Sequence, residues 1–248
     1  MSAPAIPEPL SRLRALTEAR IALGRCGAGM PTDAVLAFQL DHARARDAVH
    51  EALDVEALQA ALAPRPCVVV ASRAADRRDY LRRPDLGRRL AAADAAALQP
   101  CACDVALVIG DGLSATAIHR NAVPLLQALF PRIGHLSCGP IVLARQARVA
   151  LGDEIGERLG AAMVVMLIGE RPGLTASDSL SVYMTWDPKV GRDDSQRNCI
   201  SNIRSGGQSY EEASARLAWL MAAAARLGAA GVQLKDEYRP MAAHLDSP

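Results

Sequence analysis

A charged pair, Glu170 and Arg171, comes directly after the apolar run 163–168 and Gly169, and a Pro-Gly turn follows it. An unbroken apolar run rich in Val and Ile predicts a strand that is buried on both faces of a parallel sheet. Open α/β sheets bind their ligands just beyond the carboxyl ends of such strands. Glu170 is therefore a candidate binding-site residue, which could act as a general base or as a hydrogen-bond acceptor.

A second candidate is the turn at residues 110–114, Gly-Asp-Gly-Leu-Ser, between an apolar stretch and an alanine-rich segment. A strand, a Gly-x-Gly turn and a helix in succession allow backbone N–H groups to approach a phosphate or another polar group. The full G-x-G-x-x-G fingerprint is missing because Ala115 occupies its last position, and no Walker lysine motif occurs. The turn indicates the ligand edge of a sheet, and a stand-alone nucleotide-binding oxidoreductase stays open as an alternative.

The sequence contains no self-contained catalytic motif or metal site. G-x-S-x-G and H-E-x-x-H do not occur, and the histidines are scattered. His42 and His50 could share a helix face, but two turns separate them, which is too far for one metal ion. The six cysteines include one C-x-C and no C-x-x-C pair, a spacing that does not suit zinc. We expect free thiols, no metal and no catalytic residues in this chain.

Composition excludes several classes of function. The 28 basic and 27 acidic residues leave a net charge of +1, and aromatic residues make up only 3% of the chain. Nucleic-acid binding is not expected, because neither a basic excess for phosphates nor aromatic side chains for base stacking are available. The longest apolar runs reach about half the length of a membrane span, and the amino terminus lacks a secretory h-region. These features favour a cytoplasmic protein.

Strand and helix patterns alternate from residue 67 onward, whereas residues before it show only helical patterns. This order predicts an α/β fold, a Rossmann-like mostly parallel sheet with helices on both faces, preceded by a small helical domain. We expect a helical domain at 1–63 and a Rossmann-like domain at 64–248, with a long polar loop at 187–208. The predicted strands are 67–71, 104–109, 139–144, 163–168 and 179–186, and the predicted helices are 10–23, 33–53, 55–63, 84–98, 115–130, 153–159 and 210–227.

Arginine is concentrated in the segment 77–89, and two interpretations of it stay open. The arginines could solvate an exposed face, or they could meet a polyanionic ligand or an acidic partner surface. The same choice between solvent and a partner chain applies to the charged residues of the predicted helix 33–53.

Six segments occur in the same order as in a known family, and together they are far more specific than any single motif. The segments are ARIALGRCG (19–27), LDHARARDAV (40–49), YLRRPDLGRRL (80–90), VIGDGLSATAI (108–118), GERPGL (169–174) and CISNIRSGG (199–207). They resemble the small (light) subunit of ethanolamine ammonia-lyase.

The resemblance implies a helical head, a Rossmann-like domain and a hetero-oligomer with a large TIM-barrel subunit that holds ethanolamine and the catalytic residues. Adenosylcobalamin would lie between the two subunits and start a radical conversion of ethanolamine to acetaldehyde and ammonia. The family's cobalamin contacts match Val149, Glu170 and Cys199 of this sequence. Glu170 would accept hydrogen bonds from the corrin amides, with Arg171 as a further donor, and Cys199 would pack against the cofactor.

Two further expectations follow from comparing this chain with the family. Its amino-terminal lead is short where many relatives carry an extension associated with bacterial microcompartments, so a free cytoplasmic enzyme is expected and packaging stays open. A noncatalytic scaffold is the third interpretation, and it predicts no affinity for a cofactor even in a complex.

Overall fold

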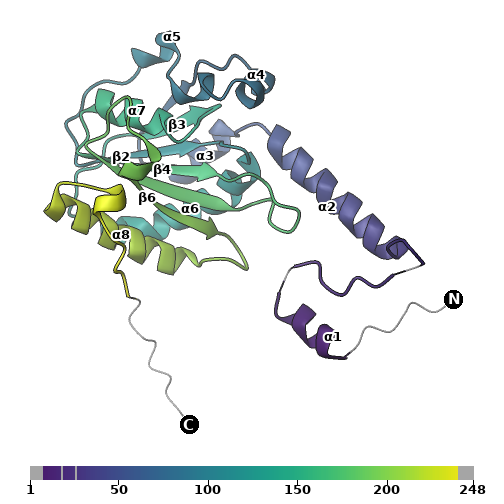
Figure 1. Ribbon diagram of the computed structural model, residues 1–248. Helices are drawn as coiled ribbons and strands as arrows, with labels where there is room; N and C mark the ends of the chain where they lie inside the picture. The colour runs from purple at the N-terminus through teal and green to yellow at the C-terminus, as the bar shows by residue number, and fades with distance from the viewer. Residues whose placement is uncertain (1–7, 18, 26, 240–248) are drawn as a thin grey trace.

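The computed structural model describes residues 8–17, 19–25 and 27–239, and its centre is one six-stranded sheet (Figure 1). Cys26 and His244, and parts of the predicted 1–63 domain and 10–23 helix, lie outside these residues. The strands are β1 (Cys67–Ala71), β2 (Val105–Gly110), β3 (Ile141–Arg145), β4 (Met163–Gly169), β5 (Leu180–Trp186) and β6 (Arg197–Ile203). The α-helices are α1 (Glu8–Ala15), α2 (Thr32–His50), α3 (Val55–Leu62), α4 (Arg77–Arg82), α5 (Ala92–Ala95), α6 (Ala115–Leu129), α7 (Leu151–Leu159) and α8 (Tyr210–Leu227), and the 3-10 helices are η1 (Leu86–Arg88), η2 (Phe130–Arg132), η3 (Asp194–Gln196) and η4 (Gly231–Gln233).

The sheet is mixed, with strand order β1-β3-β2-β4-β5-β6. Strands β1, β3, β2 and β4 pair in parallel, whereas β5 pairs antiparallel with both β4 and β6. The α/β class is confirmed, but a Rossmann-like, mostly parallel sheet is not. The physical reason lies in residues 170–179, because a parallel neighbour needs a crossover of about a dozen residues or more, usually with a helix, and this connection contains none.

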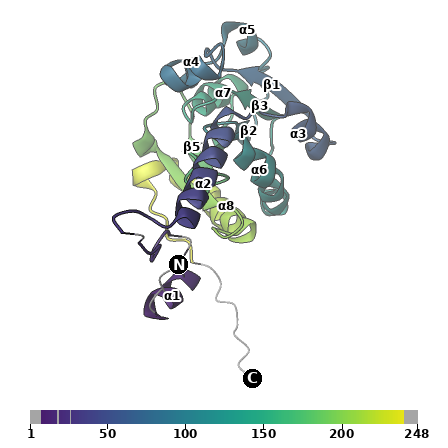
Figure 2. The ribbon, with the colours of Figure 1, turned by 90° about the vertical axis from the view of Figure 1, so that its right-hand side faces the viewer.

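Helices cover both faces of the sheet, as expected (Figures 1 and 2). Alternate residues of β4 enter different cores: Val165 packs in the cluster that holds α3, α6 and α8, and Val164 packs in the cluster that holds α7. Every residue of β2 and β4 is buried. Burying a Val, Leu or Ile side chain stabilises a fold by roughly 1.5–3 kcal/mol, so these two strands anchor the sheet.

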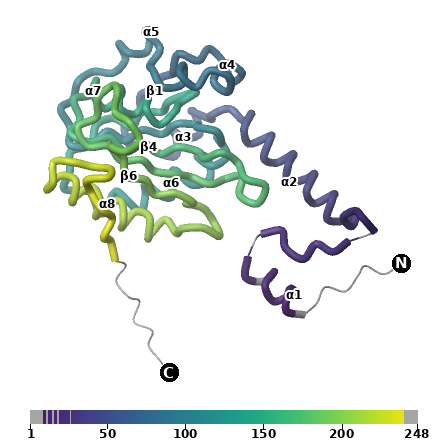
Figure 3. Tube along the Cα trace, in the orientation of Figure 1, coloured from purple at the N-terminus to yellow at the C-terminus, as the bar shows by residue number. Residues whose placement is uncertain are grey.

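Helix α3 packs with α6 in the larger core, although we assigned its residues to the helical domain. The division into domains at residue 64 stays a prediction. Helix α2 extends away from the body of the molecule, as the ribbon and the Cα trace both show (Figure 3). Within the described part of the chain, no helix combines the length and apolar content that crossing a bilayer requires.

Strand β6 occupies part of the stretch that we predicted as a loop at 187–208. The prediction was wrong because the strand has little apolar content, with Arg197, Ile200 and Ile203 as its buried residues. Pairing with β5 and a buried ion pair between Arg197 and Asp153 of α7 hold it in place.

The predicted helix over 84–98 was also wrong, because the segment holds η1 and α5 with an extended residue between them. Leu90 forms an isolated bridge with Ser72 and donates its N–H to Glu154 at 3.0 Å. Helix α1 likewise ends at Ala15, short of the predicted 10–23 span.

Candidate functional site

A cavity of about 240 Å³ lies at the carboxyl ends of β2 and β4, where the sequence predicts a ligand site. We name it the Glu170 cavity. Pockets that enclose a whole drug-sized ligand measure roughly 300–1,000 Å³, so this cavity fits part of a ligand, or one face of a larger one. Its lining residues are Tyr80, Gly112, Leu113, Arg148, Val149, Ile168, Gly169, Glu170, Arg171, Ser181 and Tyr183.

Glu170 is half-buried, and the chain itself supplies hydrogen bonds to its carboxylate. The backbone N–H of Asn202 lies 3.1 Å from Oε1, and the hydroxyl of Ser181 donates to the same oxygen. The Glu170 N–H donates to the Ser179 carbonyl at 2.9 Å, which fixes the backbone at the end of β4. The side chain of Arg171 is exposed. The donors in this structure are therefore Ser181 and Asn202, and not Arg171 as expected.

An irregularity in the β5–β6 pairing directs the Asn202 amide at Glu170. The pairing register shifts between Leu180 and Val182, and Asn202 adopts a positive φ of 57°. Asn is one of the few residue types that tolerates this left-handed conformation. Such bulges bend a strand and re-aim its groups, so a local departure from regular pairing completes the Glu170 site.

Cys199 lies on β6 directly opposite Tyr183, whose side chain lines the cavity. Burial raises the pKa of the Cys199 thiol, although hydrogen bonds to Tyr183 and Ser181 act in the opposite direction. Burial also raises the pKa of Tyr183. Reactive cysteines need a lowered pKa, so Cys199 is suited to packing and hydrogen bonding rather than to nucleophilic attack.

Val149 lies in the turn between β3 and α7, half-buried, and lines the same cavity as Glu170. Its side chain also packs against the apolar cluster beneath α7. The three residues expected at the site are thus brought to one place: Val149 and Glu170 share the cavity, and Cys199 adjoins it across Tyr183.

Two arginines lie over the buried ring of Tyr80, which lines the cavity. The guanidinium carbons of Arg148 and Arg77 lie 4.4 Å and 4.7 Å from the ring centroid, and the Tyr80 hydroxyl donates to the Ala147 carbonyl at 2.9 Å. Nε of Arg148 and Nη2 of Arg77 are buried without a hydrogen-bond partner. A buried donor without a partner is costly. Arg148 also lines the cavity, and its guanidinium group suits a ligand with carbonyl or phosphate oxygens.

The Gly-Asp-Gly turn serves packing rather than phosphate binding. A Cβ on Gly112 would overlap the Gly169 carbonyl, and one on Gly169 would overlap the Ser114 carbonyl. The Leu113 N–H donates to the Gly169 carbonyl at 2.9 Å, and the buried Asp111 carboxylate accepts two backbone N–H groups from the turn after β3. Burial raises the pKa of Asp111. Because the turn is packed against β4 in this way, the nucleotide-binding interpretation loses its main support.

The arginine-rich segment divides into internal and exposed residues. Arg77 donates to the Gly112 carbonyl at 2.9 Å, and Arg89 pairs with Glu154 at 2.8 Å. Arg83 pairs with Asp85 on the surface. The remaining exposed arginines are Arg78, Arg82 and Arg88.

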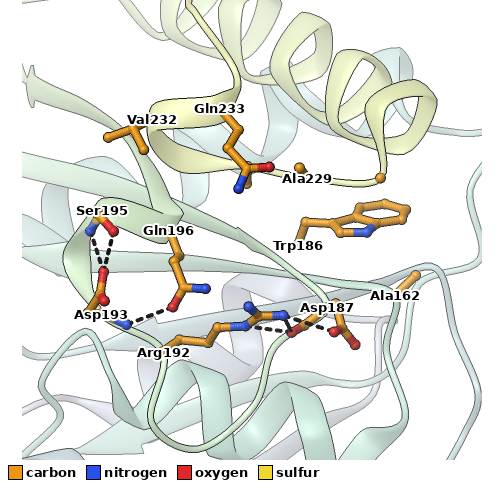
Figure 4. Close-up of a pocket in the computed structure, with 12 residues that line it drawn as sticks. Ala162, Trp186, Asp187, Arg192, Asp193, Ser195, Gln196, Ala229, Val232 and Gln233 are labelled. Carbon is orange, nitrogen blue, oxygen red and sulfur yellow. Dashed lines mark hydrogen bonds and ion pairs between the residues drawn. The ribbon is translucent and has the colours of Figure 1, made fainter.

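A larger cleft of about 770 Å³ lies at the opposite end of β4, beside Trp186 and Ala162 (Figure 4). Its polar side chains are engaged with the chain itself: Arg192 binds Asp187, and Asp193 caps η3. Both hollows are lined by polar side chains, but only the Glu170 cavity is lined by residues that the sequence analysis places at the site, Val149 and Glu170.

Sequence reasoning did not identify Tyr80, Arg148, Ser181, Tyr183 or Asn202 as site residues. Arg148 adjoins Val149, and Asn202 belongs to the segment CISNIRSGG that carried the resemblance, so both had a local signal. Ser181 and Tyr183 sit among alternating residues of β5, where nothing local separates a site residue from a packing residue.

The fold and cavity define an α/β protein with a candidate ligand site at the ends of its parallel strands. Comparison with known proteins supplies the family. The sequence model of the ethanolamine ammonia-lyase light chain matches residues 7–235. The chain belongs to this family and is a subunit of an ammonia-lyase.

Curated relatives agree, and each is an ethanolamine ammonia-lyase small subunit. The Bradyrhizobium diazoefficiens protein is 54% identical over 246 residues, which cover 96% of this chain and 94% of the relative. The Pseudomonas syringae pv. tomato protein is 52% identical, with coverage of 92% and 83%, and the Xanthomonas campestris pv. campestris protein is 51% identical, with coverage of 96% and 92%.

Proposed function

We propose that this chain forms one wall of an adenosylcobalamin site in an ethanolamine ammonia-lyase and is active only with a large subunit. The observation that carries the proposal is that Val149 and Glu170 line one small cavity and that Cys199 adjoins it, paired with the lining residue Tyr183. A site incomplete in one chain is expected where a cofactor lies between two subunits.

The residues present fit a cobalamin in three respects. The cavity is too small to enclose such a cofactor, so this chain would contact one side of it. The Glu170 carboxylate is held by Ser181 and Asn202 in a position to accept hydrogen bonds from corrin amides. Arg148 lines the cavity, and its guanidinium would be a donor for an amide carbonyl or phosphate oxygen of the cofactor.

This chain's residues would bind and shield the cofactor. Glu170 accepts hydrogen bonds, while Val149 and Cys199 pack against the ligand and exclude water. The chemistry that bound adenosylcobalamin supplies is radical formation by homolysis of its cobalt–carbon bond, which starts the conversion of ethanolamine to acetaldehyde and ammonia.

The partner in this proposal is a TIM-barrel large subunit that binds ethanolamine and carries the catalytic residues in a hetero-oligomer. The names of the relatives support it, since a small subunit implies a large one. We place the assembly in the cytoplasm, and packaging in a bacterial microcompartment is a separate hypothesis.

Ammonia release from ethanolamine tests the function. We expect none from the isolated chain, and turnover when the large subunit of the same organism and adenosylcobalamin are added together. Turnover by the isolated chain, or a mixture that stays inactive while the isolated chain binds NAD, would contradict the proposal.

A further inference from the structure

Helix α2 is long but almost unburied. It spans 19 residues, and Ala48 is its one buried residue. A helix in a protein gains most of its stability from packing an apolar face against the rest of the molecule. Helix α2 instead extends away from the body of the molecule (Figures 1 and 3). We name the described residues from Glu8 to His50 the arm. A helix of this length without packing indicates that another surface covers the arm.

Large apolar side chains are exposed mainly on the arm. Leu16 is 83% exposed, Leu36 59% and Leu40 51%, and the rest of the arm's exposed set is Leu10, Leu13, Met30 and Phe38. Elsewhere in the described part of the chain, the exposed large apolar residues are Val190, Leu227 and Val232. Scattered exposed apolar residues are normal on a protein surface, whereas a concentration of them marks an interaction site.

The apolar residues of α2 face more than one direction. Leu36 and Leu40 are one turn apart and share a face, while Phe38 lies on the opposite side of the helix. Phe38 and His42 stack beside a shallow hollow that Ala43 and Arg46 also line. A helix with apolar groups on opposite sides is suited to being enclosed by a partner rather than laid on one surface.

The base of the arm is joined to the Glu170 cavity. Nε of Arg77 donates to the Val49 carbonyl at 2.6 Å, and Nη1 of the same side chain donates to Gly112, which lines the cavity, at 2.9 Å. Arg20 pairs with Asp41 at 2.6 Å and reaches the Leu174 carbonyl, in the loop after Glu170, at 3.5 Å. A subunit that closes the cavity therefore lies within reach of the arm.

We propose that the arm is a second docking surface for the lyase's large subunit, in addition to the contact at the cofactor, and this rests on the proposed function. The charges of α2 are of both signs, with Asp41, Arg44, Arg46 and Asp47 along it, and Arg44 pairs with Asp41. Such a surface suits a protein better than a nucleic acid or an anionic membrane, each of which needs a basic face.

The test uses the full chain with Leu36→Gln and Leu40→Gln together. Gln matches Leu closely in helix propensity, so α2 is retained while the apolar contact is lost. The matched control is Leu227→Gln with Val232→Gln, the same change at exposed apolar positions outside the arm. Titration with the large subunit from the same organism should give a Kd at least about tenfold higher for the arm variant and an unchanged Kd for the control.

The possible outcomes separate this proposal from the proposed function. An arm variant that binds the large subunit as tightly as the unmodified chain overturns the docking surface and leaves the lyase function standing. An unmodified chain that fails to bind the large subunit overturns both. If the substitutions abolish only self-association, measured by sedimentation of the chain alone, the arm binds a second copy and the proposal is wrong.

Discussion

The backbone nitrogen of Asn202 in β6 lies 3.1 Å from Oε1 of Glu170, the residue that follows β4, although β6 and β4 are not adjacent in the sheet. Strand β5 lies between them and contributes the Ser181 hydroxyl to the same oxygen. Residues of the antiparallel strands β5 and β6 thus donate hydrogen bonds to a carboxylate that lies at the end of the parallel strand β4.

Ser181→Ala should weaken cobalamin binding to the assembled enzyme by about tenfold, because a carboxylate that loses a buried donor is held less firmly. The free energy of unfolding should fall by about 1 kcal/mol. Ser201→Ala, an exposed serine of β6, is the control and should change neither quantity. Equal cobalamin affinities for the two variants would argue against a positioning role for Ser181.

Gly169→Ala should lower the free energy of unfolding by about 3 kcal/mol or more, because the added Cβ overlaps backbone atoms that cannot move aside cheaply. Gly173→Ala is the control in the same connection, since a Cβ there meets only ordinary contacts at 3.6 Å. Urea denaturation of both variants measures the difference. A stable Gly169→Ala protein would show that the turns after β2 and β4 are not closely packed.

The stability that Glu154 provides should depend on pH. Burial alone would raise the pKa of Glu154, but its bonds to Arg89, to the Leu90 N–H and to Arg158 outweigh burial and lower the pKa. A carboxyl group whose pKa is lower in the folded state than in the unfolded state stabilises the fold above its unfolded-state pKa, which is about 4.3 for Glu. This stabilisation is lost as the pH falls through the folded-state pKa.

Glu154→Gln should therefore destabilise the protein at neutral pH, and the difference from the unmodified chain should shrink as the pH falls below about 4. Denaturant titrations across this range measure it. A stability difference that does not vary with pH would exclude the ion pair as its cause.

Cys199 should be protected from alkylation by the cofactor. Because burial raises its pKa, its thiolate forms at higher pH than in an ordinary cysteine, so labelling at a given pH is slower. Cys199 and Cys101 are both exposed in this chain, and adenosylcobalamin should slow labelling of Cys199 in the assembled enzyme but not of Cys101, which does not line the cavity. Mass spectrometry of labelled peptides measures the two labelling rates separately. A Cys199 labelling rate that adenosylcobalamin does not change would show that Cys199 does not contact the cofactor.

Local sequence was sufficient for the elements whose composition decides their structure. The apolar runs at β2 and β4 predicted buried strands, and Gly228 with φ 70° ends α8 at the residue expected. Strand β6 and the extended Leu90 were not predictable in this way, because β5 pairing, the Arg197–Asp153 ion pair and the Glu154 carboxylate impose them. Tertiary contacts override propensity at such positions.

The candidate site likewise contains some residues that local sequence predicts and others that only tertiary contacts place there. The position of Glu170 followed from the end of a buried strand, and the resemblance added Val149 and Cys199. Ser181 and Asn202 could not be inferred, because their role depends on the antiparallel return of β5 and on a bulge in β6. A one-residue change of register turns side chains to the other face of a sheet, and the sequence contains no local signal for that register.

Cobalamin retention by the assembled enzyme tests the central claim most directly. Glu170→Gln keeps the shape of the side chain but removes its charge and replaces one of its two acceptor oxygens with an NH2 donor. After gel filtration of the complex with adenosylcobalamin, the absorbance spectrum should show bound cofactor in the unmodified enzyme and much less in the variant, with both subunits still co-eluting. A Glu170→Gln complex that retains cobalamin as fully as the unmodified enzyme would contradict the assignment of this cavity as the cofactor wall.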